Sequence, residues 1–573
     1  MDTIPKKYKH QDVEQKWKEI WDDKQVYAWD STQPRENTFA IDTPPPTVSG
    51  SLHIGHVFSY THTDLIARYQ RMNGKTVFYP MGWDDNGLPT ERRVQNVFSI
   101  SCQPHLSYKD NWTPVRDQNK KIHEYEQVSR KNFIEACSEL TIEDEKVFEQ
   151  LWRKLGLSVD WNLQYATIDD HCRKLSQYSF LDLHEKGNVY QQESPGMWDV
   201  DFQTAVAQAE IEDRERPGAY HNLNFEVEDG SIFTIATTRP EMLAACIAVV
   251  AHPDDDRYQA YFGKQATTPL FYAKVPILPS THADPEKGTG ILMVCTFGDA
   301  ADVDWWKQSD LPVKQIIGRD GKLLPVQFGD APFTSDKPTT AQENYAQLAG
   351  LRVKQAQRKI VELLQAPGSA VSGNEAALVG EPEQITHPVK FYEKGDTAIE
   401  FVPSRQWFIK LLDYKKELLA QADKIDWKPA FMKTRYTTWV EGLNQDWCIS
   451  RQRYFGVPFP VWYPLDENKA PNYDQPIFAK AEQLPVDPLS DTPDGFIESQ
   501  RGEANGFIGD ANVMDTWATS SLTPQIASHW QSESSRHESV FPMDIRPQSH
   551  EIIRTWAFYT IVKAWMHEEK VPW

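Results

Sequence analysis

The hydrophobic positions of the N-terminal segment recur with the period of an α-helix. Four large apolar residues fall on one stripe of such a helix: Val13, Trp17, Ile20 and Trp21. Their spacing predicts an amphipathic surface helix that packs on the domain behind it. We therefore expect residues 1–34 to form an N-terminal helical extension.

After this extension the hydrophobic period changes from strand to helix and back. Residues 38–42 alternate as a short strand, residues 53–72 have helical spacing, and residues 76–79 form a second strand. A strand, a turn, a helix and a strand in this order make a parallel βαβ crossover, so the sequence predicts an α/β fold of the nucleotide-binding type. In such sheets ligands bind beyond the carboxyl ends of the strands, where the turns at 43–56 and 81–87 lie.

Residues 120–190 have mostly helical spacing, and the pattern changes near residue 200, where a β-rich insertion begins. Strand-like runs in this insertion are separated by turns rich in Pro, Asp and Gly; they cover 231–237, 246–251, 271–278 and 291–296. Residues 341–365 return to helical spacing, and 366–388 form a connection rich in Gly, Ser and Pro. We expect the proline-bearing loop at 464–510 to cover the surface.

The composition of the 573-residue chain is that of a globular protein, with 40% hydrophobic and 25% charged residues. The net charge of −22 excludes a protein that coats nucleic acid indiscriminately, since such a protein needs a basic surface. It leaves open the recognition of one particular RNA through a local basic patch. The longest nearly uncharged apolar stretch, residues 244–251, is far shorter than the ~20 residues of a membrane span.

The cysteines and the N-terminus favour a cytoplasmic location. None of the 6 cysteines belongs to a Cys-x-x-Cys pair, so the sequence predicts neither a zinc knuckle nor a disulfide framework. Residues 1–10 contain no apolar run and no cleavage-like site, which argues against a secretory signal.

The turn at 43–56 carries the most informative residues. His53 and His56 open a helix that directly follows a strand, and a helix N-terminus offers free amide groups and a positive dipole end to an anion. Gly55 lies between them, so a flat ring can approach the backbone there. Together these features predict a site for a triphosphate and its base. The alternatives are a metal-binding pair or two histidines that only cap the helix.

Leu52-His53-Ile54-Gly55-His56 resembles the HIGH signature of the class I aminoacyl-tRNA synthetases, and the resemblance extends over nearly the whole chain. Motifs similar to those of the valine, isoleucine and leucine subgroup follow in family order, at 82–91, 237–241, 446–452, 514–517 and 550–556. Among these members, the turn at 45–50, the strand at 446–452 and the segment at 515–517 look most like the valyl ones.

The resemblance implies a Rossmann-like catalytic domain that is split by a β-rich editing insertion. The expected segments after the N-terminal extension are the first half of the catalytic domain, the editing domain, a connection and an incomplete second half, at 35–204, 205–365, 366–429 and 430–573.

The resemblance also implies ATP-dependent attachment of valine to tRNA(Val) through valyl-adenylate. ATP is then a substrate, accompanied by Mg, and no zinc is expected; the expected partners are tRNA(Val), valine and ATP, with no DNA and no membrane. In the family, the residues that match His53 and His56 bind ATP and stabilise its α-phosphate while a carboxylate attacks it, and Gly55 belongs to the same ATP motif.

Asp84 lies where the family places the carboxylate that binds the ammonium group of the amino acid. The alternative is an ordinary turn aspartate, since Asp-Asp-Asn-Gly is also turn chemistry. Pro45, Pro46 and Trp447 are candidate walls of a small, dry pocket that excludes isoleucine by size, and ordinary core packing explains these rings equally well.

A pocket sized for valine cannot strongly reject threonine, a limit for which valyl enzymes are themselves the usual illustration, so a second, hydrolytic site is expected. Thr237 and Thr238 match the threonine-rich strand of the family's editing domain. Asp299 and Asp302 align with two family aspartates, although this segment is one residue shorter than usual and lacks a histidine. The first of them would bind the ammonium group of a mischarged threonine. The alternative is a pair of acidic residues in a surface turn.

The family's second ATP motif, Lys-Met-Ser-Lys-Ser, does not occur in this sequence. The simplest interpretation is a truncated synthetase that stops before this motif. Two rivals remain: an isoleucyl or leucyl relative, and a remnant that binds or edits RNA without joining an amino acid to it.

Overall fold

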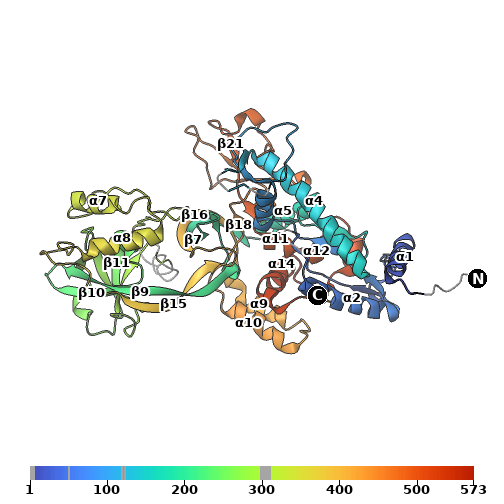
Figure 1. Ribbon diagram of the computed structural model, residues 1–573, viewed down its shortest axis with the longest axis horizontal. Coiled ribbons are helices and arrows are strands. Elements are labelled where there is room, and N and C mark those ends of the chain that lie inside the picture. Colours follow the sequence, from blue (N-terminus) through green and yellow to red (C-terminus); the bar gives the residue numbers. More distant parts are fainter. Residues whose placement is uncertain are drawn as a thin grey trace, which may run out of the picture. The chain divides into compact units, whose positions relative to one another are not determined.

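The computed structural model describes residues 7–48, 52–117, 120–121, 124–296, 298, 303 and 311–573. The chain forms two compact units (Figure 1). Unit 1 contains Met1–Tyr190 and Trp407–Trp573, and unit 2 contains Gln191–Gln406, so unit 2 interrupts unit 1 in the sequence. Among the residues that the structure describes, no helix is both long and apolar enough to cross a membrane.

The N-terminal part of unit 1 contains the predicted strand–helix–strand order. Its elements are α1 (His10–Asp23), β1 (Thr38–Ala40), α2 (Ile54–Met72), β2 (Thr76–Phe78), β3 (Met81–Trp83), α3 (Leu88–Phe98), β4 (Ile100–Cys102), β5 (Glu126–Val128), α4 (Arg130–Leu155), β6 (Gln164–Ala166) and α5 (Asp170–Glu185). β1 pairs with β2 in parallel, with Phe39 opposite Val77, which confirms the βαβ crossover. The pairs β3–β6 and β4–β5 are also parallel.

The C-terminal part of unit 1 supplies the remaining elements of this unit and one segment that lies beside β1. Its main elements are α9 (Lys415–Ala422), α10 (Lys433–Glu441), β17 (Trp447–Cys448), β18 (Ser450–Arg451), β19 (Val461–Pro464), β20 (Ile477–Phe478), β21 (Phe507–Gly509), β22 (Val513–Met514), α11 (Thr516–Ser520), α12 (Thr523–Ala527), α13 (Ser534–Val540), a π-helix, η11 (Ile553–Ala557), and α14 (Phe558–Glu568). Ile545 bridges Ile41 in parallel, so this late segment lies beside β1. The loop predicted at 464–510 contains β20 and β21, which pair with β19 in a three-stranded sheet.

Unit 2 is built on one large sheet. Its strands and helices are β8 (Thr204–Ala205), β9 (Ile211–Val227), β10 (Ile232–Thr237), β11 (Cys246–Ala251), β12 (Gln265–Thr267), β13 (Lys274–Pro279), β14 (Ile291–Cys295), α7 (Pro338–Ala346), α8 (Val353–Gln365) and β15 (Glu383–Tyr392). The strand order is β10-β9-β12-β13-β11-β14, with β15 also paired to β9. The chain enters unit 2 within β7 (Val189–Asp199) and leaves it within β16 (Glu400–Ile409). One face of α8 buries Ala356, Ile360 and Leu364 in the apolar core of this unit.

Two sequence expectations in unit 2 are corrected. The strand expected at 271–278 begins only at Lys274, because Leu270 and Tyr272 adopt left-handed backbone conformations with φ of 60° and 50°. The helical stretch expected at 341–365 is divided into two helices, α7 and α8, and Gly350 between them has φ of 80°, a conformation that favours glycine.

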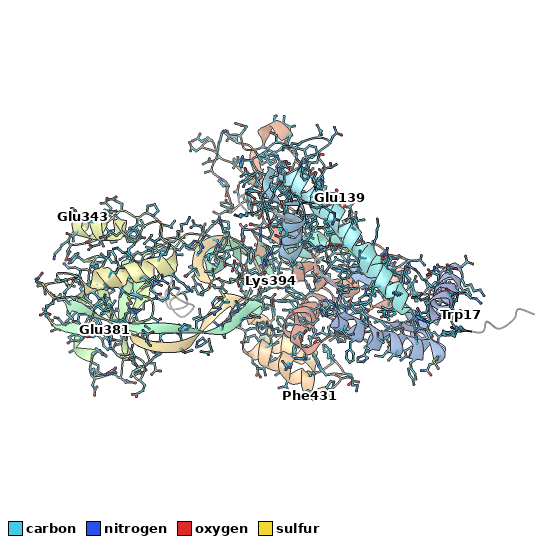
Figure 2. All side chains as sticks on the ribbon, viewed as in Figure 1. Trp17, Glu139, Glu343, Glu381, Lys394 and Phe431 are labelled. Carbon is cyan, nitrogen blue, oxygen red and sulfur yellow. The ribbon has the colours of Figure 1, made fainter. Side chains whose placement is uncertain are left out.

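Helices α1 and α2 of unit 1 expose large apolar side chains. Trp17 of α1, labelled in Figure 2, is 47% exposed, as suits the predicted surface helix. On α2 the apolar positions that define the helical pattern are largely exposed, and the buried face carries Tyr60, Thr63, Asp64 and Ala67. Asp64 can lie on this buried face because its carboxylate accepts hydrogen bonds from the backbone N–H and the hydroxyl of Ser158.

Candidate functional site

The turns at 43–48 and 81–87 lie side by side at one edge of the β1–β2 region. The backbone N–H of Asp84 donates to the carbonyl of Pro46 at 2.9 Å, and Val48 donates to the carbonyl of Asp84 at 3.3 Å. The structure thus brings together two of the predicted amino-acid-binding residues, and Pro45 precedes this contact directly. Both turns follow strands, as expected for a ligand edge of an α/β sheet.

The neighbouring carboxyl groups of this turn have different surroundings. Asp84 is half-buried, and its Oδ1 accepts a hydrogen bond from the Thr167 hydroxyl at 3.1 Å. Asp85 is completely buried, and burial together with the nearby Glu145 raises its pKa well above the ordinary value for aspartate. Asp84 is therefore the more accessible of the two carboxyl groups of this turn.

His53 and His56 cap the N-terminus of α2 through a reciprocal pair of hydrogen bonds. His53 Nδ1 accepts from the backbone N–H of Gly55 at 3.2 Å, and His56 Nδ1 accepts from the backbone N–H of His53 at 3.4 Å. The ring centroids are 4.0 Å apart. A Cβ atom on residue 55 would lie 3.0 Å from the His53 ring, so Gly55 leaves the space that this cap needs.

The caps fix which ring nitrogens carry hydrogen. Because each Nδ1 accepts a hydrogen bond, a neutral ring must carry its hydrogen on Nε2. Burial and the neighbouring His53 lower the pKa of His56 below its ordinary value, so this ring is neutral at physiological pH. Within the described residues neither Nε2 atom has a hydrogen-bond partner. Capping and ligand binding are thus compatible: Nδ1 caps the helix and Nε2–H remains as a donor.

Trp447 is fixed by contacts on its edge and on one face. Its Nε1–H donates to Asp515 at 2.9 Å, and its ring stacks on Tyr559 with centroids 3.7 Å apart. Asp515 belongs to the segment that meets the Asp84 turn, because a Cβ on Gly87 would lie 2.6 Å from the Thr516 hydroxyl. The structure therefore connects Trp447 to the Asp84 turn through its hydrogen-bond partner.

A cavity of about 350 Å³ between α10 and η11 is lined by residues to which the sequence motifs give no role. Its lining consists of Thr434, Arg435, Thr438, Trp439, His550, Glu551, Ile553 and Arg554. Among the residues that the structure describes, none accepts a hydrogen bond from the buried indole N–H of Trp439. His550 and Glu551 lie a few residues after Ile545, which bridges Ile41. The motif at 550–556 was a signal in the sequence, but the α10 contribution has no local signal.

In unit 2, Thr237 ends β10 and Thr238 follows it. The Thr237 hydroxyl accepts a hydrogen bond from the backbone N–H of Arg239 at 3.0 Å, and the Thr238 carbonyl accepts from Gln357 at 3.0 Å. The predicted partners Asp299 and Asp302 lie outside the described residues. The structure therefore locates the threonines at the end of a strand and leaves their relation to the two aspartates as a prediction.

Arg239 is a residue of this region that the sequence analysis did not select. It forms ion pairs with Glu241 at 3.0 Å and Glu400 at 2.8 Å, and it donates to the carbonyl of Gly298 at 2.8 Å. This arginine ties the threonine strand to residue 298. Its position in Thr-Thr-Arg-Pro-Glu was visible in the sequence, but Glu400 is too distant along the chain to be predicted as its partner.

Comparisons with known proteins agree with the sequence motifs. A family model described as tRNA synthetases class I (I, L, M and V) matches residues 16–573. The chain is 55% identical over 575 residues to the valine–tRNA ligase of Thermobifida fusca (strain YX), covering 100% of this chain and 64% of that protein. It is 50% identical over 574 residues to the valine–tRNA ligase of Salinispora arenicola (strain CNS-205), covering 100% of this chain and 65% of that protein.

Among solved structures, the LeuRS–tRNA–LeuAMS ternary complex of Agrobacterium radiobacter K84 superposes with a TM-score of 0.45 at 18% identity. This superposition covers 97% of the present chain and 65% of the LeuRS chain. The present chain spans 64% and 65% of the length of the two curated relatives above.

Proposed function

Because the chain belongs to the class I tRNA synthetases (I, L, M and V), we propose that it supplies the amino-acid-activating and editing parts of an enzyme that joins valine to tRNA(Val). The identity of 55% to a valine–tRNA ligase supports valine as the substrate. The observation that carries the proposal is the pair of Nε2–H donors at the N-terminus of α2.

In the first step, a carboxylate oxygen of valine forms a bond to the α-phosphorus of ATP while the bond to the bridging oxygen breaks and pyrophosphate leaves. His53, His56 and the free amides of α2 would donate to the phosphate oxygens on which charge develops. Asp84 would hold the valine ammonium group, and Pro45, Pro46 and Trp447 would bound the side chain. A terminal ribose hydroxyl of tRNA(Val) then forms the ester, and AMP leaves.

Catalysis in this scheme is positioning and charge stabilisation, so no covalent bond to the protein is needed. Mg²⁺ would arrive with the ATP phosphates. No group of three or more His, Cys, Asp or Glu side chains suited to a metal ion occurs among the residues with described positions. The proposal keeps the cytoplasmic location that the sequence predicts.

We assign the hydrolysis of mischarged threonyl-tRNA(Val) to unit 2. Thr237 and Thr238 would face the terminal adenosine and its ester, and Asp299 would bind the threonine ammonium group, with Asp302 in the same segment of the editing site. Exchange of Asp299 for Ala is expected to let threonyl-tRNA accumulate while valine activation stays near normal, because the two sites belong to different units. Clearance of threonyl-tRNA by this variant at the normal rate would contradict the assignment.

The activation step is tested by His56→Ala in a chain extended to the length of its curated relatives. Removing one preorganised donor to a developing charge typically costs about 10²–10³ in rate, so adenylate formation should slow by that order. Valine binding measured on the same protein should change little. His62→Ala is the matched control, because His62 is an exposed imidazole on the same helix. Equal losses in rate and valine binding would indicate that His56 only caps α2.

A further inference from the structure

Four polar side chains of α5 and α14 form a buried hydrogen-bond chain within unit 1. Lys563 Nζ lies 2.7 Å from Ser179 Oγ, and the same oxygen lies 2.8 Å from His567 Nε2. His567 Nδ1 in turn lies 2.6 Å from Asp182 Oδ2. Lys563 is only 2% exposed and Ser179 is fully buried. Lys563 and Ser179 must therefore satisfy their hydrogen bonds within the protein, whereas Asp182 is 19% exposed and also pairs with Lys186.

The donor and acceptor chemistry fixes the direction of each of the three hydrogen bonds in this series. An ammonium group can only donate, so Ser179 Oγ accepts from Lys563 and gives its own hydrogen to His567 Nε2. His567 then carries its hydrogen on Nδ1 and donates it to Asp182. Burial lowers the pKa of His567 to about 4, which keeps this ring neutral. This series of hydrogen bonds thus leads from the buried ammonium group of Lys563 to the carboxylate of Asp182.

The Ser179, His567 and Asp182 arrangement has the spacing of a hydrolytic triad, but it is not one. Ser179 Oγ is fully buried and already accepts the hydrogen bond from Lys563, so no substrate carbonyl can reach it. A role for this series of hydrogen bonds must therefore involve its other end, where Lys563 lies.

Lys563 faces the candidate pocket residue Trp447. Its Nζ lies 6.0 Å from the centroid of the indole, within the range of a cation–π contact. Tyr559, which stacks on the same indole, lies one helical turn before Lys563 on α14. The α14 helix therefore presents both an aromatic ring and an ammonium group to Trp447, and the hydrogen-bond chain fixes the ammonium group.

We propose that Lys563 is a positioning residue for the amino-acid pocket: through Ser179, His567 and Asp182 its ammonium group is held against Trp447 and orders the indole that bounds the valine side chain. The inference rests on the proposed function, because it takes Trp447 as a pocket wall. Lys563 acts through Trp447 and does not touch the substrate.

Burial lowers the pKa of Lys563 to about 7, so its charge changes within the physiological range. The other titratable groups along this series of hydrogen bonds are Asp182 and the adjoining Lys186 beside α5, and His567 on α14. Beyond the indole lies the buried pair of Asp515 and Arg451. Since only the charged form of Lys563 attracts the indole face, the order of Trp447 and the affinity for valine should decrease as the pH rises through about 7.

The experiment uses the 573-residue chain, with the Trp447 indole N–H signal identified in a ¹⁵N-indole spectrum by comparison with Trp447→Phe. The signal and the calorimetric Kd for valine are followed from pH 6 to 8.5. We expect both to change with one midpoint near 7, and valine to bind several-fold more tightly, on the order of 3- to 10-fold, at the acidic end.

Lys563→Met should abolish this pH dependence in both readouts. Ser179→Ala should move the midpoint to lower pH, because it removes the oxygen that accepts from the ammonium group; a merely structural role for Ser179 would not shift a midpoint. A transition near pH 7 that survives in Lys563→Met, or an indole signal with no such transition in the parent chain, would overturn the inference. If the indole titrates as expected but no valine binds at any pH, the proposed function fails while the contact between Lys563 and Trp447 stands.

Discussion

Arg239 in unit 2 and Lys563 in unit 1 are basic side chains in enclosed surroundings, and their partners give them opposite electrostatic behaviour. Arg239 lies between Glu241 and Glu400, whose side chains are 2% and 5% exposed. Burial alone would lower the pKa of Arg239, but the two carboxylates raise it well above its ordinary value. Among the described carboxylates none forms an ion pair with Lys563, and burial lowers its pKa to about 7. The comparison teaches that two buried carboxylate partners keep the partly exposed Arg239 charged, whereas a hydroxyl partner leaves the buried Lys563 able to titrate.

The largest expected effect comes from removing Arg239, the cation that pairs with Glu241 and Glu400 in unit 2. Arg239→Met leaves Glu241 and Glu400 buried without their cation, and losing one partner of such a cluster typically costs about 3–5 kcal/mol of stability. Thermal unfolding, with hydrogen exchange of β10 and β11 peptides, measures this loss in unit 2. The loss should be greater at pH 8 than at pH 5, because carboxyl groups left in an apolar site bind protons more readily when folded. A loss below about 1 kcal/mol at pH 8 would show that the cluster is solvated.

Replacing the titrating lysine has a smaller effect of opposite sign. The pKa of Lys563 is about 7 in the folded protein against an ordinary value of 10.5, so between these pH values the unfolded chain binds the additional proton and stability rises with pH. Lys563→Met removes the burial of this charge and should stabilise the chain by about 1–4 kcal/mol at pH 6. The gain should fall steadily toward pH 10, as measured by denaturant titration at several pH values. A gain that is independent of pH would contradict the titration of Lys563.

The smallest effect is expected for an exposed ion pair of unit 2. Lys390 and Asp213 lie 3.4 Å apart with side chains 52% and 60% exposed. Lys390→Ala should therefore change stability by less than about 1 kcal/mol. This variant is the control for Arg239→Met, since both remove a positive charge from unit 2. A loss comparable with that of Arg239→Met would mean that net charge, and not burial, governs both results.

The sequence predicts the α/β core of unit 1 because its signals are local. β1, α2 and β2 each show their own hydrophobic period, and His53, Gly55 and His56 mark the start of α2. In contrast, the long strand β9 and its partner β15 were not predicted as a pair. Many side chains along their ribbon are exposed, including Glu212, Asp213 and Glu215, so the ribbon lacks the continuous buried apolar face that marks a core strand.

The parts of the site that the sequence does not predict depend on contacts between distant segments. Ser179 and Lys563 are separated by 384 positions, and Trp447 and Asp515 by 68. A motif can mark Trp447 as a pocket residue, but only the folded chain shows that α14 stacks a tyrosine on it and directs a lysine to it.

The central claim, a valine site at the edge formed by the 43–48 and 81–87 turns, is tested most directly by calorimetric titration of the 573-residue chain with valine, isoleucine and leucine. The account predicts that valine binds more tightly than either larger amino acid. It also predicts that Asp84→Asn weakens valine binding by about 10- to 100-fold, because a hydrogen bond to a charged group is worth about 1.5–3 kcal/mol. Equal binding of isoleucine and valine, or an unchanged valine affinity in Asp84→Asn, would contradict it.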